Sequence, residues 1–301
     1  MAEVVTVNLS NGAKMPVVGF GSAFRAKDSA SVENFKASVL EAIQVGYRTF
    51  DTASVYFTEG LLGESLKEAF EKGLVSRHEV FVTSKLWCGD CYPQDVIPAL
   101  KKSLQALKLE YLDLYLIHWP VAVKKGVTFI NLTPDDAAAM DIQGVWREME
   151  ECVELGLTRA IGVSNFSSKK IEDLLTYSKI PPAVNQVEMH PLWQQEKLRG
   201  YCNSVNVHVS AWAPLGGPGN SWGTGHTLDN PLIKDIATKH DKTSAQVALR
   251  WGIEKGVSVI TRSFNSARIL HNFQIFDWKL DEEDHQKIGS ITQQLTEIAK
   301  N

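Results

Sequence analysis

The sequence alternates between short apolar segments rich in β-branched residues and longer segments with helical periodicity, and this pattern occurs eight times. Alternating strands and helices predict a mostly parallel sheet covered by helices. Eight units is the number that closes a (β/α)8 barrel, and 301 residues are enough for one such domain. We therefore expect a single α/β domain over residues 1–301 with the TIM-barrel fold. A doubly wound open sheet is the alternative.

The boundaries of the expected elements follow from the apolar patterns and from capping residues. The expected strands are Pro16–Phe20, Tyr47–Phe50, Val80–Ser84, Leu112–Ile117, Ala160–Val163, Ala183–Val187, Val207–Trp212 and Ser258–Thr261. The expected helices are Val32–Val45, Glu59–Lys72, Pro93–Leu107, Gln143–Glu154, Ser168–Tyr177, Gln195–Ser204, Asn230–His240, Ser244–Lys255 and Asn265–Asn272. Ser31, Pro93 and Ser167 are typical of helix starts, and the glycines at 46, 73 and 156 are typical of helix ends.

Three further segments lie outside this alternation. Thr6–Asn8 and Lys14–Met15, joined by Asn-Gly, predict a β-hairpin that covers the floor of the barrel. Residues 121–141 and 214–229 are too long for plain connections. Because they follow the fourth and seventh strands, we expect both on the active-site face. The tail from 281 to 301 is expected to form one last, C-terminal helix.

Composition excludes several classes of protein. The formal net charge is −4, and the chain has no dense Lys/Arg blocks, which argues against a nucleic-acid or polybasic membrane partner. No apolar stretch approaches the ~18–20 residues of a membrane span. The N-terminus lacks the basic and apolar regions of a secretory signal. We expect a cytoplasmic monomer whose partner is a small molecule, with no metal and, with four Cys, no disulfide scaffold.

Three ionisable residues fall at the ends of three successive expected strands. Asp51 directly follows the second strand, Lys85 ends the third, and His118 ends the fourth. Tyr56 lies five residues beyond Asp51, in the loop above them. The carboxyl ends of barrel strands converge on one rim, where catalytic groups of this fold lie. We therefore expect these four side chains to form one site.

Their chemistry is suited to donating a proton to a carbonyl that is being reduced. A Tyr hydroxyl with an ordinary pKa of ~10 is protonated at neutral pH, and a nearby ammonium is expected to lower that pKa. Asp51 would hold Lys85 charged and in place, and His118 would orient the carbonyl oxygen. A site of this kind needs a hydride from a nicotinamide cofactor.

Other interpretations remain open for these residues. A single Asp at a strand end is often a helix cap, and a single Lys often lies along apolar surface with its head in water. Cys88-Gly89-Asp90-Cys91, between a strand and a helix, resembles a thioredoxin-type redox motif. A thiol oxidoreductase or redox-sensing module is therefore the alternative from another class.

Four motifs in order identify a family resemblance that covers essentially the whole chain. GYRTFDTASVYFTEGLLG at 46–63 resembles the signature of the aldo-keto reductases. LIHWP at 116–120, GVSNF at 162–166 and NQVEMHP at 185–191 match further motifs of that family. SKLWC, MEEC and IFDW are similar to its plant branch, which contains chalcone (polyketide), codeinone, methylecgonone and deoxymugineic-acid reductases.

The resemblance implies a (β/α)8 barrel that binds NADPH in an extended form without a Rossmann domain. It makes Tyr56 the proton donor, with Asp51, Lys85 and His118 as its partners. The residues implied around the nicotinamide and pyrophosphate are Ser164, Asn165 and Gln186 at the carboxamide, Trp212 against the ring, Leu215 and Gly216 along the pyrophosphate, and Gly21, Ser22 and Asp51 on the other side. Those implied at the adenosine phosphate are Arg262, Ser263, Arg268 and Asn272. Two Arg near a 2′-phosphate favour NADPH over NADH.

The resemblance implies the reduction of an aldehyde or ketone to an alcohol. Trp87, Trp119, Phe129 and Trp222 are candidate walls of the substrate pocket, although an ordinary buried aromatic is an equally good interpretation of each. We expect a role in plant specialised metabolism, with a polyketide or alkaloid ketone as substrate. The alternatives are general detoxification of aldehydes and a non-catalytic barrel that binds NADPH and senses redox state.

Overall fold

The computed structural model describes residues 4–25, 27–127, 132–220, 223 and 225–295. Eight parallel strands close into a barrel in the order β10-β11-β12-β3-β4-β5-β6-β9. These strands are β3 (Val18–Gly21), β4 (Thr49–Asp51), β5 (Phe81–Leu86), β6 (Leu114–Ile117), β9 (Ile161–Ser164), β10 (Val184–Glu188), β11 (His208–Trp212) and β12 (Ser258–Thr261). The closure confirms the predicted (β/α)8 barrel and excludes the doubly wound sheet.

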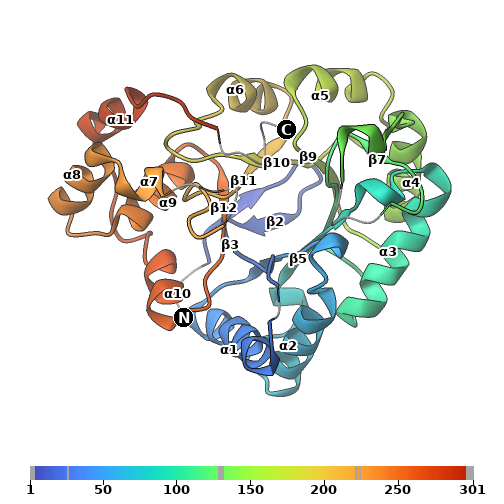
Figure 1. Ribbon diagram of the computed structural model, residues 1–301, viewed down its shortest axis with the longest axis horizontal. Coiled ribbons are helices and arrows are strands. Elements are labelled where there is room, and N and C mark those ends of the chain that lie inside the picture. The colour runs from blue at the N-terminus through green and yellow to red at the C-terminus, as the bar shows by residue number, and fades with distance from the viewer. Residues whose placement is uncertain (1–3, 26, 128–131, 221–222, 224, 296–301) are drawn as a thin grey trace.

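Helices form a ring around the strands (Figure 1). They are α1 (Ser29–Val45), α2 (Glu59–Glu71), α3 (Pro93–Leu107), α4 (Ile142–Glu154), α5 (Ser168–Leu175), α6 (Glu196–Ser204), α7 (His226–Asp229), α8 (Pro231–Lys239), α9 (Ser244–Glu254), α10 (Ser266–Phe273) and α11 (Glu282–Gly289). Pro93 is the first residue of α3, Ser167 caps α5 and Gly46 caps the end of α1, as predicted.

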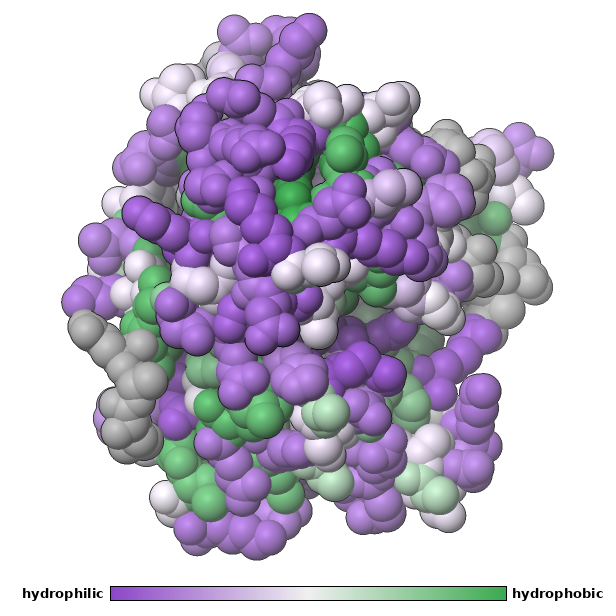
Figure 2. Space-filling model, turned by 90° about the vertical axis from the view of Figure 1, so that its left-hand side faces the viewer, coloured by the Kyte–Doolittle hydropathy of each residue, from purple (hydrophilic) through white to green (hydrophobic). Residues whose placement is uncertain are grey.

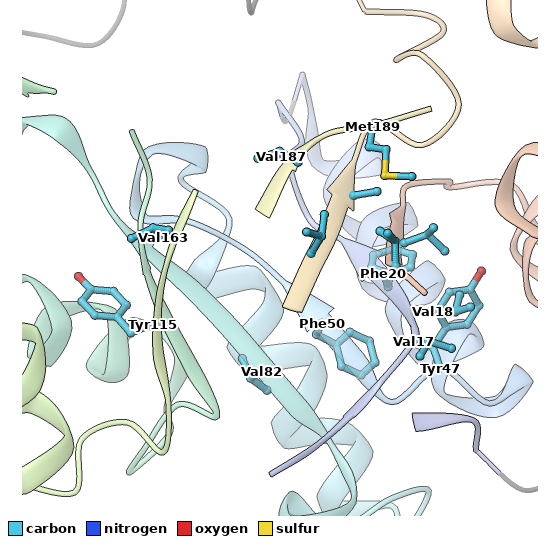
Figure 3. Close-up of a cluster of buried hydrophobic side chains, with 14 of the residues drawn as sticks. Val17, Val18, Phe20, Tyr47, Phe50, Val82, Tyr115, Val163, Val187 and Met189 are labelled. Carbon is cyan, nitrogen blue, oxygen red and sulfur yellow. The ribbon is translucent and has the colours of Figure 1, made fainter. Parts of the chain in front are cut away.

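The core lies between the strands and the helices. Alternate strand residues point outward and pack on the helical ring, and Phe50, Val82, Tyr115, Val163 and Val187 are among those labelled in Figure 3. Each of these side chains is at most 3% exposed. Because side chains alternate along a strand, the residues between them point into the barrel. That alternation directs the polar residues of the site toward the barrel axis.

The predicted hairpin is present and covers the floor of the barrel. β1 (Thr6–Asn8) pairs with β2 (Lys14–Pro16) in antiparallel register. Leu9 and Met15 from this hairpin pack in one cluster with residues at the beginnings of the barrel strands, such as Phe81 and Leu114. The floor is therefore closed by apolar contacts, which leaves the opposite rim for ligands.

Both long loops lie on that opposite rim, because each follows a barrel strand. The loop after β6 contains β7 (Ala122–Val123), which pairs antiparallel with β8 (Ala137–Ala138). The loop after β11 leads into α7.

Two of the predicted boundaries were wrong by three residues or more. The first helix begins at Ser29, capped by Asp28, whose carboxylate accepts a hydrogen bond from the Ser31 N–H; Ser31 is the third residue of a capping box rather than the cap. The tail does not form one helix from 281 to 301, because α11 ends at Gly289. Beyond it Ile291 is buried, and the Gln294 N–H donates to the Leu192 carbonyl at 2.5 Å, so tertiary contacts fix an irregular segment there.

Candidate active site

The structure brings together the four residues expected to form the catalytic site. Asp51 is the last residue of β4, Lys85 is the penultimate residue of β5, and His118 directly follows β6. Tyr56 ends a 3₁₀ turn, Ser54–Tyr56, above β4. The Lys85 Nζ donates to Asp51 Oδ1 at 2.5 Å and to the Thr52 carbonyl at 2.8 Å. The Tyr56 hydroxyl lies 3.4 Å from His118 Nε2.

The electrostatics of this cluster set the protonation states of Tyr56, Lys85 and His118. Burial raises the pKa of Tyr56, and the positive charge of Lys85, which lies 5.1 Å from the centre of the Tyr56 ring, only partly opposes it. The expected lowering of this pKa by Lys85 is present, but desolvation outweighs it and the net shift is upward. Burial lowers the pKa of His118 well below its usual range, and Lys85 adds to the effect. For Lys85, burial disfavours the charge, but Asp51 and Tyr56 raise its pKa overall. The hydroxyl is thus protonated and the imidazole neutral at pH 7.

A chain of hydrogen bonds links the predicted nicotinamide residues to this cluster. The Gln186 amide donates to Asp51 Oδ2 at 2.8 Å, and the Ser164 hydroxyl donates to the Gln186 carbonyl at 2.7 Å. Asn165 adopts a left-handed conformation with φ of 63°, and its amide donates to the His118 carbonyl at 3.0 Å. The Trp212 indole N–H donates to Asn165 Oδ1 at 3.0 Å. The predicted aromatic wall and the predicted proton donor therefore belong to one set of residues connected through side chains and backbone carbonyls.

The predicted adenosine-phosphate residues lie at the end of β12 and in α10. The Arg262 guanidinium donates to the Ala23 carbonyl at 2.5 Å and to Asn220 Oδ1 at 2.8 Å, so it connects the loops after β3 and β11. Arg268 Nε donates to Ser263 Oγ at 3.3 Å, and Asn272 is buried. Neither guanidinium pairs with a carboxylate among the residues that the structure describes. Two uncompensated guanidiniums fit the phosphate groups of NADPH.

The remaining predicted cofactor residues lie at the same rim. Gly21 is buried at the end of β3, and a Cβ there would lie 3.1 Å from Ile260 Cγ2, so the strand ends approach closely. Ser22 is buried and its hydroxyl lies 3.0 Å from that of Thr58. Leu215 and Gly216 follow β11, and the Gly216 N–H donates to the Ala213 carbonyl at 2.8 Å, which closes a turn that ends at this glycine with φ of 75°.

Two of the four candidate substrate residues border the cluster. The Trp87 ring lies edge-on to His118 with 5.4 Å between centroids, and the Trp119 ring is nearly parallel to it at 6.5 Å. Phe129 and Trp222 lie outside the described residues.

Several residues of the site were missed by the sequence analysis. The Thr52 carbonyl is a ligand of Lys85, and a backbone acceptor leaves no signal in a sequence. Thr58, which is 2% exposed, contacts both Ser22 and Thr52, and its position before the second helix could have indicated it. Asn220 accepts a hydrogen bond from Arg262 and lies in a glycine-rich loop. Polar residues are common in such loops, so its presence there gave no signal of a role.

Two other clusters do not offer the chemistry that their residue types suggest. Cys88 and Cys91 are both buried free thiols, and burial raises the pKa of Cys88 to about 12. Reactive redox cysteines need an accessible, low-pKa thiolate, so this pair does not support the thioredoxin-type alternative. His240, Asp281 and Asp284 lie within reach of a common ion, but the Lys239 ammonium already bridges the two carboxylates at 2.5 and 2.9 Å.

The fold and the site define a class: a closed (β/α)8 barrel whose carboxyl rim carries a Tyr–Lys–Asp–His set, with Arg262 and Arg268 beyond the end of β12. Comparison with known proteins agrees. The aldo/keto reductase family model matches residues 17–293. The chain is 53% identical to the (1S)-1,7-diacetoxy-luvungin A aldo-keto reductase of Citrus sinensis over 93% of this chain and 86% of the relative. It is 48% identical to the NADPH-dependent codeinone reductase 1-4 of Papaver somniferum, over 98% and 92%.

A solved structure, the aldo-keto reductase of Bombyx mori in complex with NADP, superimposes with a TM-score of 0.88 at 36% identity, covering 97% of this chain and 94% of that one. This chain belongs to the aldo/keto reductase family. The predicted plant branch, the predicted NADPH cofactor and the predicted oxidoreductase activity on carbonyl compounds are thereby confirmed.

Proposed function

We propose that this protein reduces the ketone or aldehyde group of an extended plant specialised metabolite, of the polyketide or alkaloid kind, to an alcohol with NADPH. The observation that carries the proposal is the Tyr56–His118 contact at 3.4 Å beside a Lys85 ammonium fixed by Asp51. The names of the relatives above give (1S)-1,7-diacetoxy-luvungin A and codeinone as the compounds on which they act, which supports an extended substrate.

Tyr56 is the proton donor of the proposed reaction. Its hydroxyl is protonated at neutral pH because burial raises its pKa. NADPH, when bound, supplies the hydride to the carbonyl carbon. As negative charge develops on the carbonyl oxygen, the Tyr56 hydroxyl gives up its proton to that oxygen. The Lys85 ammonium, 5.1 Å from the ring centre, then stabilises the tyrosinate that remains.

His118 orients the carbonyl rather than donating a proton. Because burial holds its pKa well below the usual range, the ring is neutral and its Nε2 faces the space that Tyr56 also faces. A neutral imidazole in this place offers one N–H to the substrate oxygen without competing as an acid. Asp51 acts through Lys85 and Gln186, both of which it holds by hydrogen bonds.

The residues that would hold the cofactor form a continuous line along the rim. The Trp212 ring, fixed by Asn165, offers an aromatic face for the nicotinamide. With the cofactor bound, Ser164 and Gln186 would hold the carboxamide, Gly21, Ser22, Leu215 and Gly216 would line the pyrophosphate, and Arg262, Ser263, Arg268 and Asn272 would hold the adenosine phosphate. Trp87 and Trp119 beside His118 are the proposed inner walls for the substrate.

We also propose that the protein is a cytoplasmic monomer. In the described part of the chain, no helix is long and apolar enough to cross a bilayer. The side of the molecule seen in Figure 2 is largely hydrophilic, and its hydrophobic areas are small and separate. The described residues of this face offer no large apolar patch to a membrane or to a second copy of the chain on that side of the molecule.

A single-atom substitution tests the role of Tyr56. Tyr56→Phe removes the proton donor, so reduction of a carbonyl should fall by at least about a thousandfold in kcat/KM, while NADPH binding, followed by quenching of tryptophan fluorescence, should change less than about threefold. Tyr177→Phe, which removes the same atom just beyond α5, is the matched control and should keep full activity. Equal turnover by Tyr56→Phe and wild type would overturn the proposal and favour the non-catalytic NADPH-binding alternative.

A substrate comparison separates the proposed role from general aldehyde detoxification. Higher kcat/KM for multi-ring ketones than for short reactive aldehydes supports the specialised role. The reverse order supports detoxification.

A further inference from the structure

One aromatic side chain next to the site is neither buried nor used by the fold. Phe57 directly follows Tyr56 and is 79% exposed, the largest value among the exposed large hydrophobic side chains that the structure describes. The next value in that group is 51%, at Leu155. An exposed apolar residue on its own is ordinary. Its backbone conformation makes Phe57 unusual.

Phe57 is held in the left-handed region, with φ of 58° and ψ of 23°. It is the only aromatic residue among the described non-glycine residues with positive φ. A β-carbon in this region crowds the backbone, and glycine or Asn adopts it more readily than a bulky side chain does. Glycine or Asn at position 57 would therefore strain the backbone less, and the exposed Phe57 ring adds no stability through burial.

The segment that carries the ring is rigid on both sides. The Phe57 N–H donates to the Ser54 carbonyl at 3.2 Å and closes the 3₁₀ turn that ends at Tyr56. The next residue, Thr58, is 2% exposed and its hydroxyl contacts those of Ser22 and Thr52 at 3.0 and 3.4 Å. The backbone at Phe57 is thus fixed at the rim, one residue from the proton donor, and the ring that it carries is open to solvent.

We propose that Phe57 is a specificity-determining residue that covers the apolar body of the substrate where it extends out of the site. This inference rests on the proposed carbonyl reduction at Tyr56. Trp87 and Trp119 flank His118 and form the inner walls, so a short aldehyde is held by these residues and by the tetrad. A carbonyl compound with a flat, multi-ring body extends further and reaches the Phe57 ring. Phe57 does not take part in the chemical step.

Replacing Phe57 by Asn should weaken the binding of an extended substrate without lowering the stability of the protein. Phe57→Asn removes the ring and places at φ of 58° a residue that tolerates the left-handed region. The melting temperature should therefore stay the same or rise. The KM for an extended apolar aldehyde should rise about tenfold, because an exposed aromatic face no longer contacts it. The kcat and the KM for a short aldehyde should both change less than about twofold.

The test uses two aldehydes that differ only in their apolar body, propanal and 2-naphthaldehyde, with NADPH. Lys108→Asn is the matched control, because Lys108 has the same left-handed backbone, with φ of 56°, at the end of α3 on the opposite face of the barrel. It should have the same effect on melting temperature and none on either substrate. Phe57→Tyr keeps the ring and should restore the KM for 2-naphthaldehyde.

Three outcomes overturn the inference. An unchanged KM for 2-naphthaldehyde in Phe57→Asn would show that the ring does not contact the substrate. An equal loss on both aldehydes would show that the substitution disturbs Tyr56 instead. If the wild-type protein reduces neither aldehyde nor any multi-ring ketone, the proposed function fails and takes this inference with it. Failure of the proposed function is distinguishable from failure of this inference, because it is seen in the wild-type protein before any substitution is made.

Discussion

Lys85 and Asp51 form a buried ion pair, and we expect the effects of their substitution on the free energy of unfolding to be strongly non-additive. The Lys85 side chain is fully buried and that of Asp51 is 6% exposed, with 2.5 Å between Nζ and Oδ1. At an effective dielectric constant of about 20, two unit charges at this distance attract by about 7 kcal/mol before desolvation is subtracted. Removing one partner of such a pair costs about 3–5 kcal/mol, because the other charge stays buried without compensation.

A double-mutant cycle measures this coupling. Asp51→Asn keeps an acceptor for the Gln186 amide but leaves the ammonium uncompensated, and Lys85→Met keeps the volume but leaves the carboxylate uncompensated. Each should lower the free energy of unfolding by about 3 kcal/mol, measured by urea denaturation at pH 7. The double variant buries no charge at this place, so it should be about 3 kcal/mol more stable than the sum of the two losses predicts.

A surface pair provides the control for this cycle. Lys169 Nζ lies 2.8 Å from Asp173 Oδ1, but the two side chains are 71% and 57% exposed. The same substitutions there should show a coupling below about 1 kcal/mol. If the loss of stability in the Lys85/Asp51 double variant equals the sum of the two single losses within about 0.5 kcal/mol, the argument that the two buried charges stabilise each other is refuted.

Two further predictions concern pH and the tight approach of the strands. Burial lowers the pKa of His208 from its ordinary 6.5 to about 4, so its neutral form is favoured in the folded state; the stability it contributes is complete above pH 6.5 and is lost as the pH falls toward 4. Between pH 7 and pH 5 the free energy of unfolding should fall by about 2 kcal/mol through this group. In urea denaturation, His208→Asn should show a smaller fall than the wild-type protein. Equal falls in the two proteins would contradict the assignment. A Cβ at Gly162 would lie 2.5 Å from the Val184 carbonyl, so Gly162→Ala should lower the free energy of unfolding by more than about 2 kcal/mol. At Gly200 in α6 nothing lies within 4 Å of a Cβ, so Gly200→Ala should raise it by up to about 1 kcal/mol. Equal effects of the two substitutions in urea denaturation would contradict the packing argument.

The sequence predicted the parts of the fold that local patterns determine. Each barrel strand overlaps its predicted range, because a buried parallel strand is a short apolar segment between helical ones. The start of α1 was misplaced by three residues, since Asp28 and Ser31 are both good caps and only the reciprocal bonds between them show which one leads. The end of α11 could not be predicted, because the contacts that fix the tail come from residues about a hundred positions away, such as Leu192.

For the site, the sequence predicted which residues meet but not how their energies balance. Strand ends placed Asp51, Lys85 and His118 on one rim without any structure. The direction of the Tyr56 pKa depends on how far burial exceeds the effect of one ammonium, and this balance is set by packing. Phe57 left no signal as a functional residue, because its left-handed backbone is visible only in the structure.

The most direct test of the account is NADPH consumption at 340 nm by the purified protein, at neutral pH, with short aldehydes, cyclic ketones and multi-ring ketones, and with NADH in parallel. The account predicts turnover with NADPH, slower turnover with NADH because Arg262 and Arg268 would bind the 2′-phosphate, and the highest kcat/KM for multi-ring carbonyl compounds. Binding of NADPH without turnover of any carbonyl compound would contradict the catalytic role assigned to Tyr56 and its partners.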